Sequence, residues 1–477
     1  AVVVEEELRG DDGDDERAAE LEEHAPSEVE PPPLPPPLPV AEAVREALAP
    51  ELGLSRGDAQ RTLLNLLNGR LVALPSAEPA RVVPAWEGEA PQEPQCKAGT
   101  KHTSLQGKHF VFRNTQEHRY SHMAMISPLP DKALWRFAVA WQSTRTGIEG
   151  TADQEFLLSF SDAPSHHDAH WTRPHAVPLS PSNTAVWGPV LHLNRDTNEL
   201  WLFYAHSTSC ITTAKRFAPG GDIRYVRSRD GVAWSEPTTI LPQADGGGVP
   251  KVVGNQLHVH KATGRWILPV WREQLHGGAY GSTCKPAVQR TIATASGALI
   301  SKDQGKTWEE RGWWRASTRW LIEGTVAETP TGRLVMLFRA GKRSEKLYSI
   351  VSDDAGDTWT SPVGTDIPNP DAKANLITLK SGTLALGFND VPSGIRRHMR
   401  LALAEDATAW RRVGEVESTK PGANFAYPTL AQDGCFVYMV YSVTRRGSKL
   451  PMAESGIKIG VFQLTQAEAL GSTAALS

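Results

Sequence analysis

Long apolar runs, closely spaced cysteines and an excess of positive charge are all missing from this chain of 477 residues. No apolar stretch approaches the ~20 residues that a membrane-spanning helix requires. The formal net charge is −4, whereas nucleic-acid binding needs a concentration of positive charge on one surface. We therefore expect a soluble protein that binds neither nucleic acid nor the interior of a membrane.

Cysteine is scarce, and its four positions are Cys96, Cys210, Cys284 and Cys435. They form no Cys-x-x-Cys pair, so the spacing indicates neither a zinc site nor a redox-active pair. We interpret them as separate thiols buried in a large core. The N-terminus shows no apolar stretch typical of a signal peptide. Because the chain begins at Ala1 rather than Met, a targeting segment could have been removed, and the sequence does not decide the compartment.

The N-terminal part differs in composition from the rest. Residues 1–40 are strongly acidic and then almost all proline. Such a segment cannot bury enough apolar surface to offset the entropy lost on ordering, so we expect a disordered arm. Residues 41–74 have helical spacing of their apolar positions and predict a short helical segment. Residues 75–105 are expected to be a linker.

Beyond the linker, short runs of β-branched and aromatic residues alternate with Gly, Asp, Asn and Pro. Examples are RFAVAW, ELWLFYAH, RWILPVW, RLVMLFRA and CFVYMVYS. Comparable runs recur roughly every 45 to 65 residues, which is typical of propeller blades rather than of a sandwich. The 15 Trp residues suit sheets that pack face to face. We predict an all-β domain over residues 106–466, followed by a tail at 467–477.

One turn sequence is repeated. SKDQGKTW at Ser301–Trp308 and SDDAGDTW at Ser352–Trp359 both read S-x-D-x-G-x-T-W. A copy one residue shorter lies at Ser228–Trp234, and degenerate copies lie at Ser161–Trp171 and Ala404–Trp410. The Asp side chain can accept backbone N–H groups within such a turn, and Gly supplies a positive φ. The motif resembles the Asp-box of sialidase-like propellers, which joins the outer two strands of a blade.

The runs and turns together predict a six-bladed β-propeller of the sialidase type. The expected blades cover residues 120–175, 185–241, 249–311, 320–363, 370–413 and 420–465. The segment HFVFR at His109–Arg113 is expected to close the ring by pairing with the last blade. A seventh blade stays open as an alternative.

Three further segments resemble the sialidase family. LIEGTVAETPTGRLVMLFRAG resembles the segment in which a helper carboxylate precedes a substrate-binding arginine, which implies those roles for Glu323 and Arg339. AYPTLAQDGCFVYMVY resembles the segment that carries the nucleophilic tyrosine, here Tyr427. GIRRHMRLALAED resembles the strand that begins with another carboxylate-binding arginine, which implies Arg396 with Arg397 as the alternate.

The first predicted blade departs from the usual family pattern. Sialidases carry Arg-Ile-Pro there, whereas in HRYSHMAMISPLPD the arginine position is taken by His122, with Arg119 earlier in the segment. A bacterial branch of sialidase-like proteins has a similar histidine followed by Glu-Gly-x-x-Asp, which this chain matches at Glu149–Asp153. The resemblance implies Asp153 as the acid and Glu149 as the alternate. Turn capping by Asp153 and a core role for His122 remain open.

The chemistry implied by this resemblance needs no metal and no organic cofactor. A sialoside carries a carboxylate on the carbon that is attacked, so a neutral tyrosine avoids the repulsion that a carboxylate nucleophile would meet. Glu323 would act as the base for Tyr427, and Asp153 would protonate the leaving oxygen. Two guanidinium groups, those of Arg339 and Arg396, would hold the substrate carboxylate.

Three functions follow from these patterns. The first is a glycoside hydrolase that removes a terminal acidic sugar of a glycan, sialic acid or a related keto-sugar acid, with retention. The second is a glycosidase or lyase for another acidic sugar such as a uronic acid, with His122 in a catalytic role. The third is a propeller that binds glycans or proteins without catalysis, because this fold hosts many functions.

Overall fold

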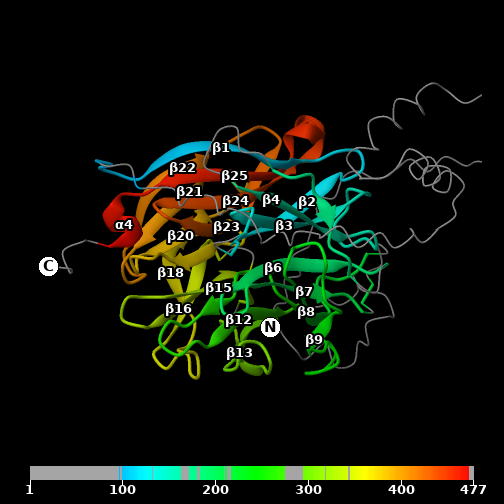
Figure 1. Ribbon diagram of the computed structural model, residues 1–477, viewed down its shortest axis with the longest axis horizontal. Coiled ribbons are helices and arrows are strands. Elements are labelled where there is room, and N and C mark those ends of the chain that lie inside the picture. Colours follow the sequence, from blue (N-terminus) through cyan, green and yellow to red (C-terminus); the bar gives the residue numbers. More distant parts are fainter. Residues whose placement is uncertain are drawn as a thin grey trace, which may run out of the picture. The chain divides into compact units, whose positions relative to one another are not determined.

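The computed structural model describes residue 96 and residues 99–130, 133–162, 171–179, 183–208, 210–211, 216–273, 294–316, 319–341 and 344–471. These residues form six antiparallel sheets arranged as the blades of a propeller (Figure 1). The predicted disordered arm, the helical segment and most of the linker lie outside the described residues. No helix in the part that is described has the length and apolar character to cross a membrane.

The first, second, fourth and fifth blades are four-stranded sheets whose strands pair in chain order. Blade 1 has β2 (Tyr120–Pro128), β3 (Phe137–Thr144), β4 (Glu155–Ser161) and β5 (His175–Ala176). Blade 2 has β6 (Val186–Asn194), β7 (Glu199–His206), β8 (Asp222–Ser228) and β9 (Thr238–Leu241). Blade 4 has β15 (Leu321–Glu328), β16 (Leu334–Ala340), β17 (Lys346–Ser352) and β18 (Val363–Pro368). Blade 5 has β19 (Asn375–Thr378), β20 (Leu384–Asn389), β21 (Met399–Ala404) and β22 (Arg411–Glu417).

The third blade has its first strand split in two, so that both pieces pair with the same second strand. Its strands are β10 (Lys251–Val252), β11 (His258–Val259), β12 (Trp266–Arg272), β13 (Ala295–Ser301) and β14 (Glu309–Trp314). The segment between β10 and β11 contains Asn255, whose side chain donates to carbonyl groups of blades 4 and 5. The interruption therefore places a polar side chain where the first strands of several blades meet.

The sixth blade joins the two ends of the domain. β1 (Ser104–Arg113) pairs with β25 (Gly456–Gln463), which pairs with β24 (Phe436–Arg445) and then β23 (Ala423–Asp433). Figure 1 shows blue β1 beside red β25. The predicted ring closure is confirmed, and β1 begins within the segment expected to be linker. The sheets number six, so the alternative of a seventh blade is wrong for the described domain.

Short helical turns follow β24 and β25. They are η1 (Gly447–Lys449), η2 (Met452–Glu454) and α4 (Gln466–Leu470). Thr465 and Glu468 form a capping box at the start of α4, in which each side chain satisfies a backbone N–H of the other residue. The expected C-terminal tail therefore begins as an ordered helical turn.

The Asp-box turns have the hydrogen bonds that their sequence predicts. In the turn between β13 and β14, Asp303 Oδ1 accepts the Thr307 N–H at 2.9 Å and Trp308 Nε1 donates to the Gly305 carbonyl at 3.1 Å. Gly305 has φ +85°, a conformation that a side chain would resist. The same indole-to-carbonyl bond is present in the other copies that are fully described, made by Trp234, Trp359 and Trp410. The copy at Ser161–Trp171 includes residues outside the described ranges.

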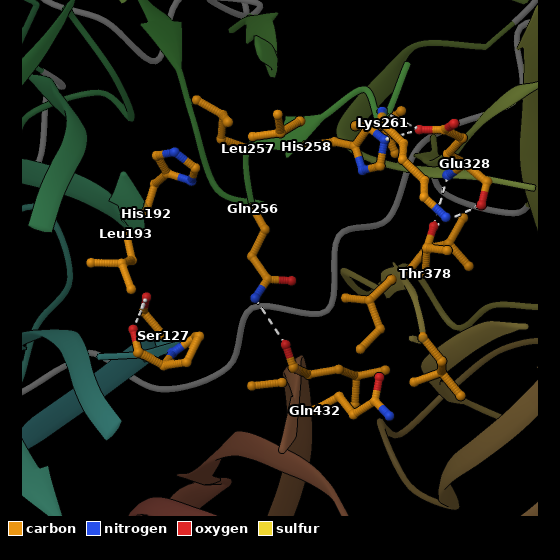
Figure 2. A pocket seen from close by; sticks show the side chains of 18 of the residues that line it. Ser127, His192, Leu193, Gln256, Leu257, His258, Lys261, Glu328, Thr378 and Gln432 are labelled. Atoms are coloured by element: carbon orange, nitrogen blue, oxygen red, sulfur yellow. Dashed lines mark hydrogen bonds and ion pairs between the residues drawn. The ribbon is translucent and has the colours of Figure 1, made fainter. Parts of the chain in front are cut away.

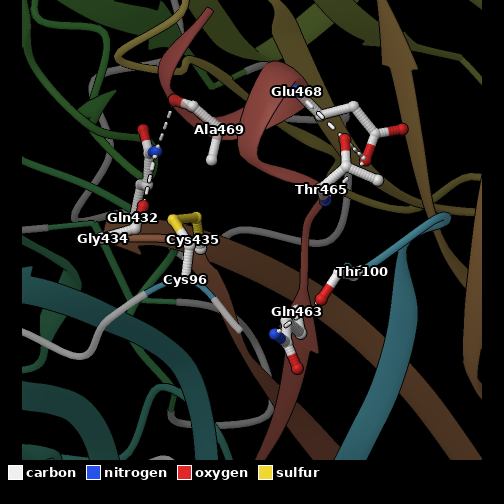
Figure 3. Close-up of a disulfide and its surroundings, with 9 residues drawn as sticks. All are labelled: Cys96, Thr100, Gln432, Gly434, Cys435, Gln463, Thr465, Glu468 and Ala469. Atoms are coloured by element: carbon white, nitrogen blue, oxygen red, sulfur yellow. Dashed lines mark hydrogen bonds between the residues drawn. A yellow bond between two sulfur atoms is a disulfide. The ribbon is translucent and has the colours of Figure 1, made fainter. Parts of the chain in front are cut away.

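Cys96, Cys210 and Cys435 are not separate thiols, so that interpretation is wrong for the described cysteines. Cys96 and Cys435 form a disulfide with a Cα–Cα distance of 5.2 Å across a sequence separation of 339 (Figure 3). Cys210 is also disulfide-bonded. Spacing along the chain cannot reveal such a pair, because only closure of the ring brings residue 96 to the β23–β24 turn. Disulfides of this kind are typical of oxidising compartments.

We expect Cys96→Ala to lower the free energy of unfolding by about 2–4 kcal/mol, because the disulfide restricts a very large loop of the unfolded chain. Urea unfolding followed by tryptophan fluorescence measures this loss. The double variant Cys96→Ala/Cys435→Ala should lose about the same amount, since either substitution removes the same bond. An unchanged unfolding midpoint in Cys96→Ala would contradict a stabilising role.

Candidate active site

Bulges in the first strands of the blades turn side chains toward one another. The pairing register of β2, β6, β15 and β23 with the second strands shifts by one residue near the strand start. The residue at each shift has a positive φ: 53° for Met123, 61° for Gly188, 54° for Glu323 and 61° for Tyr427. A residue with a side chain pays roughly 1–2 kcal/mol for this conformation. Bulges re-aim side chains and are frequent beside active sites.

Tyr427, Glu323 and Arg339 form a closed triangle of hydrogen bonds. The Tyr427 hydroxyl donates to Glu323 Oε1 at 2.6 Å and accepts from Arg339 Nη1 at 2.9 Å. Arg339 Nη1 also contacts both Glu323 oxygens, at 3.1 and 3.2 Å. Glu323 and Tyr427 are buried, 4 % and 7 % exposed, and the Arg339 side chain is 12 % exposed. The structure thus brings together three of the residues that the sequence singled out.

A second arginine completes one side of this group. Arg396 lies with its guanidinium carbon 5.2 Å from the centre of the Tyr427 ring and donates to the Asp371 carbonyl at 2.7 Å. Asp371 also accepts from Arg339 Nε at 2.7 Å, so one residue fixes both guanidinium groups. Arg397, the predicted alternate, is exposed.

Charges within the group set its ionisation. Burial, reinforced by the negative charge of Glu323, raises the pKa of Tyr427 well above its usual value. Burial acts to lower the pKa of Arg339, but Glu323, Tyr427 and Asp371 outweigh it and raise that pKa. At neutral pH the Tyr427 phenol is therefore neutral and lies beside the fixed positive charge of Arg339.

The first blade contributes a histidine to the same group. His122 is buried, and its ring centre lies 4.2 Å from that of Tyr427. Burial lowers the pKa of His122 well below its usual value, and the positive charges of Arg396, Lys373 and Arg339 lower it further. The imidazole is therefore neutral and does not replace the charge of an arginine. Arg119 is exposed, and among the described residues no hydrogen bond or ion pair joins its side chain to this group.

Glu149 and Asp153 lie in the same loop between β3 and β4 but in different surroundings. Glu149 Oε1 accepts from Gln142 Nε2 at 2.5 Å, and Glu149 interacts electrostatically with Arg396 and Glu323. Burial raises the pKa of Glu149, although hydrogen bonds from Tyr120 and Gln142 oppose the shift. The predicted alternate thus belongs to the group around Tyr427.

Asp153, the predicted acid, instead holds the turn that precedes β4. Its carboxylate accepts the backbone N–H groups of Arg145 at 2.8 Å and Thr146 at 3.0 Å. Partial burial acts to raise the pKa of Asp153, but hydrogen bonds from Thr151, Thr146 and Arg145 lower it overall. The structure does not bring Asp153 into the group around Tyr427, because its oxygens are already used by the turn.

Comparison with known proteins identifies the family. The model of the BNR repeat-like domain matches residues 135–439. The chain belongs to this family. A sialidase from Bacteroides fragilis is 24% identical over 228 residues, which cover 44% of this chain and 37% of that protein. The chain thus spans well under half the length of that relative.

Solved structures of similar fold include a protein of unknown function from Dyadobacter fermentans, with a TM-score of 0.61 and 15% identity over 76% of this chain and 100% of that one. The Hadza microbial sialidase Hz136 is similar with a TM-score of 0.58 and 16% identity, covering 76% of this chain and 69% of the other. At such identities the likeness establishes the fold. It confirms the predicted sialidase-type propeller.

One acidic residue of this BNR-repeat propeller was missed in the sequence. Glu273 follows β12 and accepts from Trp271 Nε1 at 2.8 Å. Burial raises its pKa to about 7, and its electrostatic neighbours are Arg339 and Glu323. In the sequence, Arg272 and Glu273 follow the apolar run WILPVW, much as Arg339 follows RLVMLF, so charged residues at the end of an apolar run were the available clue.

The BNR-repeat propeller also has a cavity of about 800 Å³, at the end of the propeller axis opposite to the group around Tyr427. It is lined by the far ends of the first strands, on the side where the Asp-boxes lie. Figure 2 shows Gln256 in the middle of this cavity, with His192 on one side and Glu328 and Thr378 on the other. None of the predicted site residues lines it, so the candidate active site is the group around Tyr427. Within the described ranges, no cluster of His, Cys, Asp and Glu is suited to a metal ion.

Proposed function

We propose that this protein is a retaining exo-glycosidase that releases a terminal acidic sugar, sialic acid or a related keto-sugar acid. The observation that carries the proposal is the hydrogen bond from Tyr427 to Glu323, with Arg339 in contact with both. This is the arrangement of a weak nucleophile with an adjacent base and an orienting group. The sialidase relatives of similar fold support the same reaction class.

In the first step, the Tyr427 oxygen attacks the anomeric carbon and its proton passes to Glu323. The bond from that carbon to the leaving oxygen breaks, and the Glu149 carboxyl group gives its proton to the leaving oxygen. The product is a covalent glycosyl-tyrosine, and Glu149 is left as a carboxylate. The raised pKa of Glu149 favours this role, because an acid must hold its proton at the working pH.

In the second step, the Glu149 carboxylate removes a proton from water, and the resulting hydroxide attacks the anomeric carbon. The bond to the Tyr427 oxygen breaks, and the phenol regains its proton from Glu323. Two displacements at one carbon give retention of configuration. Both side chains return to their starting protonation states.

Arg396 and Arg339 supply the positive charge for the substrate carboxylate. Arg339 donates through Nε to Asp371 and through Nη1 to Glu323 and Tyr427. Arg396 makes fewer hydrogen bonds within the protein, so more of its N–H donors can bind a substrate. Guanidinium groups bind carboxylates through paired hydrogen bonds. An acidic sugar therefore fits this side of the site better than a neutral one.

A second candidate is an enzyme for another acidic sugar such as a uronic acid. The observation that favours it is the neutral, buried His122 at the position of a third arginine. A neutral imidazole can exchange a proton with the substrate, which a guanidinium group cannot do at neutral pH. Activity toward uronides without activity toward sialosides would support this candidate.

The test uses the full chain with a panel of fluorogenic α-sialosides, keto-sugar acid glycosides and uronides. Proton NMR then identifies the anomer released first. Release of the α-anomer from an α-sialoside is the expected result. First release of the opposite anomer would exclude the glycosyl-tyrosine, and no turnover of any acidic glycoside, with binding on a glycan array, would favour a non-catalytic propeller.

A further inference from the structure

A buried lysine, Lys373, links several blades beside the group around Tyr427. Lys373 lies two residues before the start of β19 and is 1 % exposed. Its Nζ lies 3.1 Å from each of three oxygens, which are Asn255 Oδ1, the Pro428 carbonyl and Thr429 Oγ1. These oxygens belong to blades 3 and 6, whereas Lys373 belongs to blade 5. One side chain thus connects three blades beside the site.

All three partners of Lys373 act as acceptors. The Thr429 hydroxyl donates its proton to the Ala124 carbonyl at 2.9 Å, so toward Lys373 it can only accept. An ammonium group has three N–H donors, which matches three acceptors, whereas a neutral amine has two. The geometry therefore selects the charged form of Lys373, although a buried charge is costly unless it is bonded in this way.

Asn255 extends the network to the remaining bulge. Its Nδ2 donates to the Glu323 carbonyl at 2.9 Å and to the Ala374 carbonyl at 3.2 Å. Its Oδ1 accepts from Lys373 and from Asn375 Nδ2 at 3.2 Å. The amide cannot be reversed without placing its oxygen against two carbonyl groups. Asn255 is 1 % exposed, so water does not compete for these bonds.

The side chains of Lys373, Asn255 and Thr429 thus form one network, and each of them donates a hydrogen bond to a backbone carbonyl within a different bulge. These are Ala124 in β2, Glu323 in β15 and Pro428 in β23. At each of these bulges Met123, Glu323 or Tyr427 holds a positive φ, which a residue with a side chain adopts only when its surroundings enforce it. Backbone restraint is needed at these points.

We propose that Lys373, acting through Asn255 and Thr429, is the positioning residue that holds the three bulges in register and so keeps Tyr427 on Glu323. The inference rests on the proposed function for its effect on turnover, but its structural part stands without it. Lys373 is not a catalytic residue, because its burial keeps it from the substrate. No ligand is needed for the network to act.

Burial and the charge of Glu323 act on the pKa of Lys373 in opposite directions. Burial lowers its pKa to about 7, while the negative charge of Glu323 on β15 opposes that shift. On the side of β2 it faces His122, whose neutral state it helps to maintain. The charge of Lys373 thus lies between the base and the imidazole of the candidate site.

The test compares Thr429→Val with Thr429→Ser. Valine keeps the shape but removes the hydroxyl that links Lys373 to Ala124, whereas serine keeps the hydroxyl. We expect Thr429→Val to lower kcat roughly 10- to 100-fold with KM changed less than about threefold, and Thr429→Ser to stay within about threefold of the unmodified protein in both. Equal kcat in the two variants would overturn the proposal.

Crystal structures of Thr429→Val and Lys373→Met separate this inference from the proposed function. The expected result is displacement of Tyr427 from Glu323 and relaxed φ angles at the bulges, within an intact propeller. Unchanged bulges in both variants would overturn the inference even if the protein is an active glycosidase. Displaced bulges in a protein that hydrolyses no acidic glycoside would uphold it while the proposed function fails. If Lys373→Met does not fold, the Thr429 pair decides alone.

Discussion

Tyr427→Phe is expected to lower kcat toward an α-sialoside roughly 10³-fold or more, because it removes the nucleophile while leaving the ring in place. The ring keeps its contact with His122 at 4.2 Å, so the site should retain its shape. Steady-state kinetics with a fluorogenic α-sialoside measures the loss. KM should change little, since the hydroxyl contacts Glu323 and Arg339 in the free protein.

Tyr441→Phe is the matched control. Its hydroxyl also donates to a buried glutamate, Glu417, at 2.8 Å, but it belongs to the core of the sixth blade. Tyr427→Phe removes two hydrogen bonds to charged groups and Tyr441→Phe removes one, each worth about 1.5–3 kcal/mol of stability. A loss of stability alone would therefore lower the activity of both variants. Turnover that survives Tyr427→Phe as well as Tyr441→Phe would rule out the tyrosine mechanism.

Glu149→Gln is expected to lower kcat/KM, which reports the first step, by roughly 10²- to 10⁴-fold for substrates with a poor leaving group, because leaving-group protonation is lost. Aryl glycosides with an acidic phenol should lose much less, since such a leaving group departs without full protonation. Parallel kinetics on a natural disaccharide and on an aryl glycoside measure the difference. An equal loss on both substrates would point to a role in binding instead.

The pH dependence follows from the raised pKa of Glu149. The acid works while it is protonated, so its contribution is full below its pKa and is lost as the pH rises through that value. The ratio of the unmodified rate to the Glu149→Gln rate should therefore fall with rising pH, and this ratio cancels the titration of other groups. Asp153→Asn is the matched control and should stay within about threefold, because Asp153 holds a turn. The reverse pattern would restore Asp153 as the acid.

Local sequence patterns were sufficient for the fold. The turn Ser301–Trp308 contains its own donors, acceptors and glycine, so its structure depends on neighbours within the same eight residues. Strand runs with the spacing of blades then predicted six sheets and their closure by the segment at His109–Arg113. Each of these inferences needs only contacts between residues close in sequence, apart from the closure itself.

The candidate site could be predicted only where the signal was local. Glu323, Arg339, Arg396 and Tyr427 were predicted because the short segments that contain them resemble segments of the sialidase family. The choice between Glu149 and Asp153 could not be made in this way. The two lie in one loop with similar composition, and their roles differ because Gln142 and Arg396 face one while backbone N–H groups hold the other.

The sequence by itself determined the blades, their turns and the residues that stand at the inner strand ends, because periodicity and turn chemistry act over a few residues. Only the tertiary structure decided which distant residues meet. It joined Cys96 to Cys435, placed Lys373 against Asn255 and Thr429, and put a neutral His122 against Tyr427. Those contacts depend on closure of the ring, which brings six separately formed sheets to one axis, and no pattern within a single blade specifies them.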